Sequence, residues 1–282
     1  MSIVAIAGCG GDDDDAAAEP TSTTQATVVA DPTTTVPDEA ACPSSEEPLR
    51  IVLVNDDGVV NPAIDAMVDL LGEQEGVELT IVAPAEERSG SSDQTTPGGA
   101  TYQEASTPGG NPAYSVNGFP ADAVAVALDD LALDPHLFVS GVNPGQNVGS
   151  LAAISGTVGV GRTAVRRGYP ALAVSAGLEF DDEQFAYAAE LGAEWIAENC
   201  AALVAGTAQT DTVTSINVPA CPVAQMGPLQ EVPRATEIAE GVNVFVSTCD
   251  QSDPAPATDV AALLAGYPSI SQVEPDITPP GP

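Results

Sequence analysis

From residue 50 onward, short apolar runs alternate with segments of helical spacing, and this alternation constrains the fold more than any other feature. The runs RIVLV (50–54), VELTIVAP (77–84), LFVSG (137–141), PALAVSAG (170–177) and DTVTSINVP (211–219) predict strands. Residues 63–73, 120–131, 156–168 and 181–203 predict the helices between them. Apolar strands separated by helices favour a parallel sheet that is covered on both faces. The predicted fold class is therefore α/β, a three-layer Rossmann-like sandwich with a mostly parallel sheet.

The C-terminal part of the chain is less regular. Residues 220–282 are richer in proline, and only 241–249 and 267–273 are predicted as additional strands. Residues 113–118 are predicted as a further short extended segment. We expect one domain over residues 49–282, in which 220–282 form a small irregular β extension.

The first 48 residues differ in composition. Thr, Ser, Pro and acidic residues dominate this stretch, which predicts a disordered tether. Residues 6–9, IAGC, resemble a bacterial lipobox, in which Cys9 would be lipidated and the protein exported to the cell surface or released from the cell. The apolar start is short and has no basic residues before it, so an ordinary N-terminus with an isolated cysteine is the alternative.

The remaining cysteines are Cys42, Cys200, Cys221 and Cys249. An even number in an exported chain favours disulfides, and the expected positions relative to the sheet favour pairing Cys42 with Cys200 and Cys221 with Cys249. This is one of three possible connectivities, and four reduced thiols are the alternative.

The net charge of the chain argues against polyanionic partners. The chain has 41 acidic and six basic residues, a formal net charge of −35, and all six basic residues are arginine. Because nucleic-acid polymers and anionic membranes are bound by basic surfaces, we expect neither as a partner.

Oxygen-bearing side chains follow several of the predicted strands. Asp56 and Asp57 follow the first strand, Ser89 follows the second, and Asn143 follows LFVSG. The carboxyl ends of parallel strands meet at one edge of the sheet, which is where such folds bind ligands. Carboxylate, hydroxyl and amide oxygens suit a hard divalent cation such as Mg²⁺, Mn²⁺ or Ca²⁺, and the absence of clustered His or Cys argues against zinc.

The motif SGTV (155–158) opens a predicted helix on the same edge. Ser155 is the expected N-cap, and the backbone N–H groups of Gly156 and Thr157 would be available to a phosphate. A cation next to a phosphate-binding helix start is the arrangement that metal-assisted phosphate hydrolysis requires. Taken alone, each motif is more often an ordinary turn or helix cap, so the prediction depends on their convergence.

Six motifs in order carry a resemblance to a known family: RIVLVNDDGVVNPAI, VAPAEERSGSS, GFPADAV, SGVNPGQNVG, SGTV and GYPALAVS. Together they resemble the SurE family of survival-protein nucleotidases over about residues 50–219. The resemblance implies a metal site at Asp56, Asp57, Ser89 and Asn143, and phosphate contacts at Asn147, Ser155, Gly156 and Thr157. It also implies hydrolysis of nucleoside monophosphates and other small phosphomonoesters, dependent on a divalent cation, by a 5'/3'-nucleotidase of the acid-phosphatase-like kind. We further expect the protein to be a homodimer.

The sequence departs from this family at three places. Ile154 stands where a tyrosine is usual before SGTV, and Phe119 stands where a threonine is common. The long hairpin of many members is shortened between Cys221 and Thr258. These departures bear on substrate preference and oligomeric state rather than on the metal site.

The expected mechanism is hydrolysis by a metal-activated water, which Asp56 or Asp57 would orient or deprotonate. Direct attack by an aspartate is the rival mechanism, ranked lower because the DxD spacing of aspartyl-phosphate enzymes is missing. The alternative functions are a lipid-anchored protein that binds a phosphorylated ligand without turnover, and an inactive adhesion or scaffold domain.

Overall fold

The structure is a computed structural model that describes residues 42–178 and 182–278. The chain divides into residues 1–38 and a compact unit over residues 39–282. The predictions for Cys9 and for most of the tether therefore lie outside the described residues.

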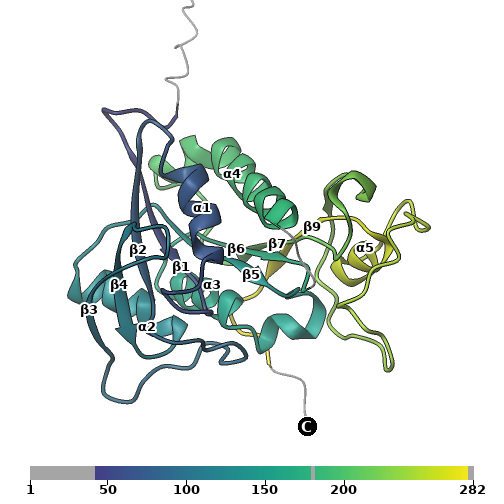
Figure 1. Cartoon of the computed structure of the whole chain (residues 1–282), viewed down its shortest axis with the longest axis horizontal. Coiled ribbons are helices and arrows are strands. Elements are labelled where there is room, and N and C mark those ends of the chain that lie inside the picture. Colours follow the sequence, from purple (N-terminus) through teal and green to yellow (C-terminus); the bar gives the residue numbers. More distant parts are fainter. Residues whose placement is uncertain (1–41, 179–181, 279–282) are drawn as a thin grey trace, which may run out of the picture. The chain divides into compact units, whose positions relative to one another are not determined.

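One mixed sheet runs through the compact unit, with the strand order β3-β4-β2-β1-β5-β6-β7-β9-β8 (Figure 1). Its central strands are parallel, whereas β3 pairs antiparallel with β4, and β9 antiparallel with β7. The strands are β1 (Leu49–Val54), β2 (Val77–Pro84), β3 (Thr101–Ser106), β4 (Pro112–Asn117), β5 (Leu137–Pro144), β6 (Ala171–Ala176), β7 (Val213–Asn217), β8 (Gln230–Glu231) and β9 (Ser269–Val273).

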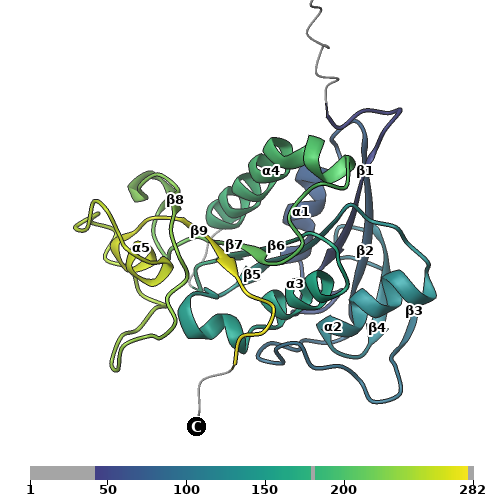
Figure 2. The same cartoon turned by 180° about the vertical axis from the view of Figure 1, so that it is seen from behind.

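Helices cover both faces of this sheet, as the two opposite views show (Figures 1 and 2). The helices α1 (Ala63–Leu71) and α4 (Asp182–Val204) lie on one face, and α2 (Pro120–Ala125) and α3 (Gly156–Arg166) lie on the other. The fifth helix, α5 (Asp259–Ala265), belongs to the C-terminal region.

Strand β1 shows why most positions of the central strands are apolar. Ile51 and Leu53 belong to the core beneath α1 and α4, whereas Val52 and Val54 belong to the core beneath α2 and α3. Successive side chains of a strand point to opposite faces, so apolar residues dominate both faces of a strand that is buried on both sides. The three-layer α/β prediction and its central parallel strands are confirmed.

Two features of the sheet differ from the sequence-based expectation. Residues 241–249 form no strand, because Val242 and Val246 are exposed and only Val244 of the three alternating valines is buried. Strand β3 was not predicted, since all but one of the residues of TYQEAS are exposed and the segment has no apolar face to reveal it. Helix α2 also ends at Ala125, and the chain continues as a π-helical turn over Val126–Asp130.

The structure joins the four described cysteines in two disulfides. The sulfur atoms of Cys42 and Cys200 are 1.94 Å apart, and those of Cys221 and Cys249 are 2.00 Å apart. These are the two pairs that the sequence favours. The first ties the segment before β1 to α4, and the second closes a loop in the C-terminal region.

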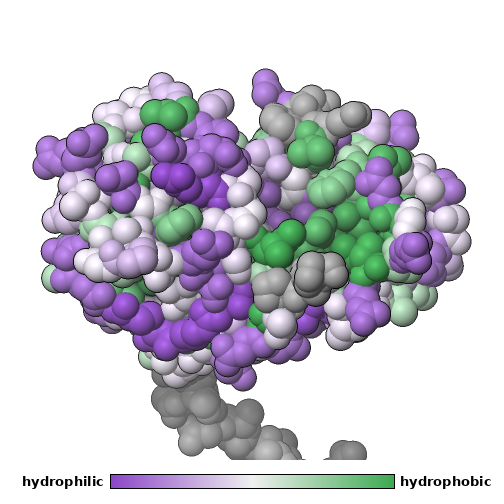
Figure 3. All heavy atoms as spheres, turned by 90° about the horizontal axis from the view of Figure 1, so that it is seen from below, coloured by the Kyte–Doolittle hydropathy of each residue, from purple (hydrophilic) through white to green (hydrophobic). Residues whose placement is uncertain are grey.

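Seen from below, apolar side chains gather on the right-hand half of the molecule, while the left-hand half is mostly hydrophilic (Figure 3). The exposed apolar residues of the C-terminal region include Val242, Phe245 and Val246.

Within the described ranges, no helix has the length and apolar character needed to cross a bilayer.

Candidate active site

The loops that follow β1, β2 and β5 meet at the carboxyl edge of the sheet. β2, β1 and β5 are neighbours in the sheet, so their carboxyl ends lie side by side. The backbone N–H of Arg88 donates to the carbonyl of Asp56 at 2.7 Å, and that of Val59 donates to the carbonyl of Pro84 at 2.7 Å. The predicted convergence of the first two loops is therefore observed directly.

A tight turn presents the two aspartates. The side chain of Asn55 accepts from the N–H of Gly58 at 3.2 Å and donates to its carbonyl at 3.0 Å. Gly58 has a φ of +97°, and a Cβ at this position would lie 3.1 Å from the carbonyl carbon of Glu86. The turn thus requires glycine, both for its backbone conformation and for its contact with the loop after β2.

Asp56 is 2% exposed and faces the first turn of α3. Its Oδ1 accepts from the Thr157 hydroxyl at 2.7 Å, and the Thr157 backbone N–H also donates to its carboxylate. A Cβ on Gly156 would lie 2.7 Å from Oδ2 of Asp56, so only glycine allows this approach. Burial raises the pKa of Asp56, and the two Thr157 bonds work against that rise.

Asp57 is 8% exposed, and its Oδ2 is buried without a hydrogen-bond partner. Burial, followed by the negative charges of Asp56 and Glu87, raises the pKa of Asp57 to about 7. No arginine contributes to this shift. Two adjacent buried carboxylates thus lack a compensating positive charge from the protein, which is the arrangement that a bound cation would complete.

Ser89 lies on the loop after β2, and Asn143 lies near the carboxyl end of β5. Ser89 is exposed, and its backbone N–H donates to Glu87 Oε1 at 2.8 Å. Asn143 is 7% exposed and donates its amide nitrogen to the carbonyl of Gly145 at 2.7 Å, which leaves its amide oxygen as the atom to offer a cation. No group of three or more His, Cys, Asp or Glu side chains gathers in a metal-binding cluster among the residues described. A cation here would therefore take a mixed set of oxygen ligands.

The residues expected to contact phosphate form a second layer of the site. Asn147 donates to Ser175 Oγ at 2.9 Å and to Thr157 Oγ1 at 3.4 Å, and its backbone N–H donates to Asn217 Oδ1 at 2.7 Å. Ser155 is the N-cap of α3 and accepts from the N–H of Val158 at 3.1 Å. The Thr157 side chain points toward Asp56 and connects the start of α3 to the carboxylate pair through a hydrogen bond. Thr157 is also one of the residues expected to contact phosphate.

Three residues of this site escaped the sequence reasoning. Glu87 raises the pKa values of both aspartates, and Ser175 and Asn217 hold Asn147 from the ends of β6 and β7. The signal for the last two was present, since each is a polar residue at the carboxyl end of an apolar strand. Nothing in EERSG distinguishes Glu87 from a surface residue.

All six arginines of the chain form ion pairs with acidic side chains. The pairs are Arg50–Asp134, Arg88–Glu86, Arg162–Asp93, Arg166–Asp93, Arg166–Asp276, Arg167–Asp129 and Arg234–Glu274. The chain has no lysine. The described part of the protein therefore offers no uncommitted side-chain cation for a substrate phosphate.

The fold and the strand-edge site define an α/β protein whose buried carboxylate pair faces a helix start. The family of survival protein SurE matches residues 51–240, and the chain belongs to that family. A relative described as 5'-nucleotidase SurE, from Carboxydothermus hydrogenoformans, is 32% identical over 257 residues, covering 82% of this chain and 92% of the relative. A protein of the same description from Prochlorococcus marinus is 31% identical over 253 residues, covering 82% and 92%.

The fold is also shared with a solved structure. The SurE protein from Aquifex aeolicus superposes with a TM-score of 0.62 at 22% identity, over 81% of this chain and 94% of that one. This likeness shows that the α/β architecture extends over most of the described residues.

Proposed function

We propose that this protein is a divalent-cation-dependent phosphomonoesterase that hydrolyses nucleoside monophosphates, with 5'-nucleotidase and 3'-nucleotidase activity. Its relatives are described as 5'-nucleotidases, which supports the substrate class. The single observation that carries the proposal is Asp57, whose buried carboxylate oxygen has no partner and lies beside a second buried carboxylate.

Asp56, Asp57, Ser89 and Asn143 would hold the cation, which we expect to be Mg²⁺, Mn²⁺ or Ca²⁺ because every donor atom is oxygen. The buried, unpartnered oxygen of Asp57 supports this assignment. When bound, the cation would supply charge neutralisation of the phosphate and acidification of the attacking water.

The protein's own groups would orient the reactants. Asn147, with Ser155, Gly156 and Thr157 at the α3 N-terminus, would bind the phosphate, because helix starts favour anions. Thr157 fixes the carboxylate of Asp56 through two hydrogen bonds, so Asp56 would keep one orientation. Asp57 is held by no such bond on Oδ2, and it is the group we expect to orient or deprotonate the water.

A cleft on the face of the sheet that α1 and α4 cover would offer room for the organic part of the substrate. It has a volume of about 470 Å³ and lies between α1 and the start of α4. Asn61, from the loop after β1, and Pro144, the last residue of β5, form part of its wall, and Pro62 and Phe185 add apolar surface. Four acidic residues also line the cleft, so it would favour a leaving group without negative charge: Asp65, Asp69, Asp182 and Glu190.

We further propose that the protein is exported, anchored by a lipid on Cys9, and homodimeric. The pairing of all four described cysteines supports an oxidising compartment. The exposed Val242, Phe245 and Val246 support a protein contact on the C-terminal region. Peptide mapping of unreduced protein tests the bridges, and four freely alkylated thiols would contradict both them and the export argument.

A phosphatase assay tests the main proposal. Purified protein stripped with EDTA should release no phosphate from AMP, and added Mn²⁺ or Mg²⁺ should restore release. Binding of AMP without release, in the presence of either metal, would instead support a binding protein. Absence of both binding and release would support an inactive scaffold domain.

A further inference from the structure

The loop after β2 is fixed at both ends, with Ser89 between them. At one end the Arg88 N–H donates to the carbonyl of Asp56 at 2.7 Å. At the other end the Ser92 N–H donates to the carbonyl of Ile154 at 3.0 Å, and the Ser92 hydroxyl donates to the carbonyl of Ala153 at 2.7 Å. The second attachment therefore docks the Ser89 loop onto the segment that leads directly into Ser155.

Helix α3 is shaped to receive this loop. A Cβ on Gly159 would lie 2.0 Å from the carbonyl oxygen of Ser92, so the loop backbone rests directly on the helix at this glycine. Arg162 follows three residues later, on the same side of the helix, because residues three apart are neighbours on a helix surface. It is 4% exposed.

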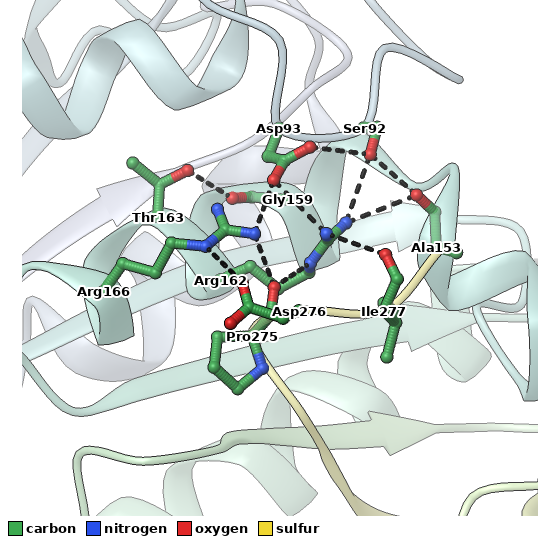
Figure 4. Close-up of polar contacts among 10 residues, drawn as sticks. All are labelled: Ser92, Asp93, Ala153, Gly159, Arg162, Thr163, Arg166, Pro275, Asp276 and Ile277. Carbon is green, nitrogen blue, oxygen red and sulfur yellow. Dashed lines mark hydrogen bonds and ion pairs between the residues drawn. The ribbon is translucent and has the colours of Figure 1, made fainter. Parts of the chain in front are cut away.

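The guanidinium of Arg162 bridges the two segments. Its Nη1 donates to the Ser92 hydroxyl oxygen at 3.2 Å and to the Ala153 carbonyl at 3.3 Å, and Nη2 lies 3.3 Å from Oδ2 of Asp93 (Figure 4). One side chain thus contacts the loop within four residues of Ser89 and the turn within two residues of Ser155.

The C-terminal segment holds Arg162 from the other side. Nε donates to the carbonyl of Pro275 at 2.8 Å, and Nη2 donates to the carbonyl of Ile277 at 3.1 Å (Figure 4). Arg166 pairs with Asp93 at 2.7 Å and with Asp276 at 3.2 Å, so the cluster balances two arginines with two aspartates. The charge of Arg162 is compensated within the cluster.

Burying a guanidinium has a desolvation cost that an apolar residue in the same space would avoid. Its planar fork of five donors can, however, connect segments that an apolar side chain would only touch. Here it connects segments that lie 70 and 113 residues away along the chain. The segments that it connects lead into Ser89 and Ser155, which points to a geometric role at the site.

We propose that Arg162 is a positioning residue, which sets the loop carrying Ser89 against the helix start and is itself fixed by the backbone of Pro275 and Ile277. This inference rests on the proposed function, because it assigns to Ser89 a place at the cation. Loss of the Arg162 bridge leaves the Arg88 end of the loop attached and leaves the Ser92 end held only by its own bonds to Ala153 and Ile154.

Calorimetric titration of the metal-free, full-length protein with Mn²⁺ tests this role. Arg162→Gln should weaken Mn²⁺ binding at least tenfold, the size of effect that supporting residues have on metal affinity. The number of sites per folded molecule should stay the same, whereas a purely structural defect would lower that number and leave the dissociation constant unchanged. Arg162→Lys, which keeps the charge without the fork, should bind Mn²⁺ with intermediate affinity.

Arg167→Gln is the matched control, since Arg167 is the C-cap of α3 and pairs with Asp129 outside the cluster. It should bind Mn²⁺ as the parent protein does. Ser92→Ala should also weaken binding, and the double variant should lose less than the sum of the two single effects, because both substitutions remove the bond between Arg162 and the Ser92 hydroxyl. Should Arg162→Gln fail to fold, Ser92→Ala carries the test alone.

Parent affinity for Mn²⁺ in a folded Arg162→Gln protein, or equal weakening in Arg167→Gln, would overturn the positioning role. When Ser92→Ala carries the test, parent affinity in that variant would overturn it. A parent protein that neither binds Mn²⁺ nor hydrolyses AMP would overturn the proposed function and this inference with it. Parent activity together with an unaffected Arg162→Gln overturns only the inference.

Discussion

Two clusters of charged side chains lie against the same helix, α3, and they are built in opposite ways. At the helix start, Asp56 and Asp57 are both buried, and no arginine offsets the shifts of their pKa values. Further along the helix, Arg162 and Arg166 are balanced by Asp93 and Asp276. A cluster that satisfies its own charges is complete without a ligand, whereas one that leaves like charges buried together requires a cation from outside. The difference separates the structural cluster from the functional one.

Asp57 should give the largest effect. Asp57→Asn removes the carboxylate that we expect to bind the cation and to handle the proton of the attacking water. We expect kcat/KM for AMP in saturating Mn²⁺ to fall by about 10²–10⁴-fold. Asp129→Asn, which alters only the ion pair with Arg167 outside both clusters, should retain parent turnover and serves as the control. Near-parent turnover by Asp57→Asn would contradict the functional assignment of the pair.

Asp57→Asn should lower activity but raise the stability of the metal-free protein. The pKa of Asp57 is raised in the folded state, so ionisation at neutral pH opposes folding. Its contribution to stability is full below the ordinary value of 3.8 and is lost as the pH rises through about 7. In EDTA at pH 8, Asp57→Asn should therefore unfold at higher urea than the parent, by about 4 kcal/mol at most.

This gain should shrink as the pH is lowered from 8 to 5, since Asp57 then takes up its proton in the folded parent protein. It should also disappear when Mn²⁺ is added to the parent, because the cation would stabilise the carboxylate pair. A gain that is the same at pH 8 and pH 5 would show that the charge of Asp57 is not its cause.

Asp93 should show the reverse behaviour. Its partial burial works toward a higher pKa, but the bond from Arg166 and the charge of Arg162 hold the pKa below its ordinary value. Its contribution to stability is thus present above 3.8 and is lost only as the pH falls through the lowered value. Asp93→Asn should cost about 1–3 kcal/mol, equally at pH 8 and pH 5, in urea titrations. A loss that grows between pH 5 and pH 8 would contradict this sign.

The smallest effect should come from salt. With a formal net charge of −35, the protein should repel an anionic substrate at low ionic strength. Screening at moderate salt should lower KM for AMP by a few-fold, over distances of about 10 Å. The comparison of NaCl with KCl controls for specific ion effects. A KM that rises steadily with salt would contradict this prediction, because it would mean that the protein attracts the anionic substrate although its arginines are paired.

Much of the site could be predicted because its residues follow strands that can be recognised from their own apolar residues. Asp56, Asp57 and Asn143 come directly after such strands or at the end of one, and the parallel arrangement brings their loops together. The direction of the Thr157 side chain could not be predicted. Its bond to Asp56 joins residues 101 positions apart, and the same SGTV sequence caps many helices that face no carboxylate.

The sequence by itself determined the alternation of strands and helices, the polar loops on one sheet edge and the family of the chain. The tertiary structure alone decided that 241–249 would not become a strand, that β3 would pair with β4, and that Arg162 would be buried at the meeting point of three segments. The reason is physical. The periodicity of apolar residues shows how one segment can bury its own side chains. These three outcomes depend instead on which distant segment offers a free strand edge, a glycine or a carbonyl group.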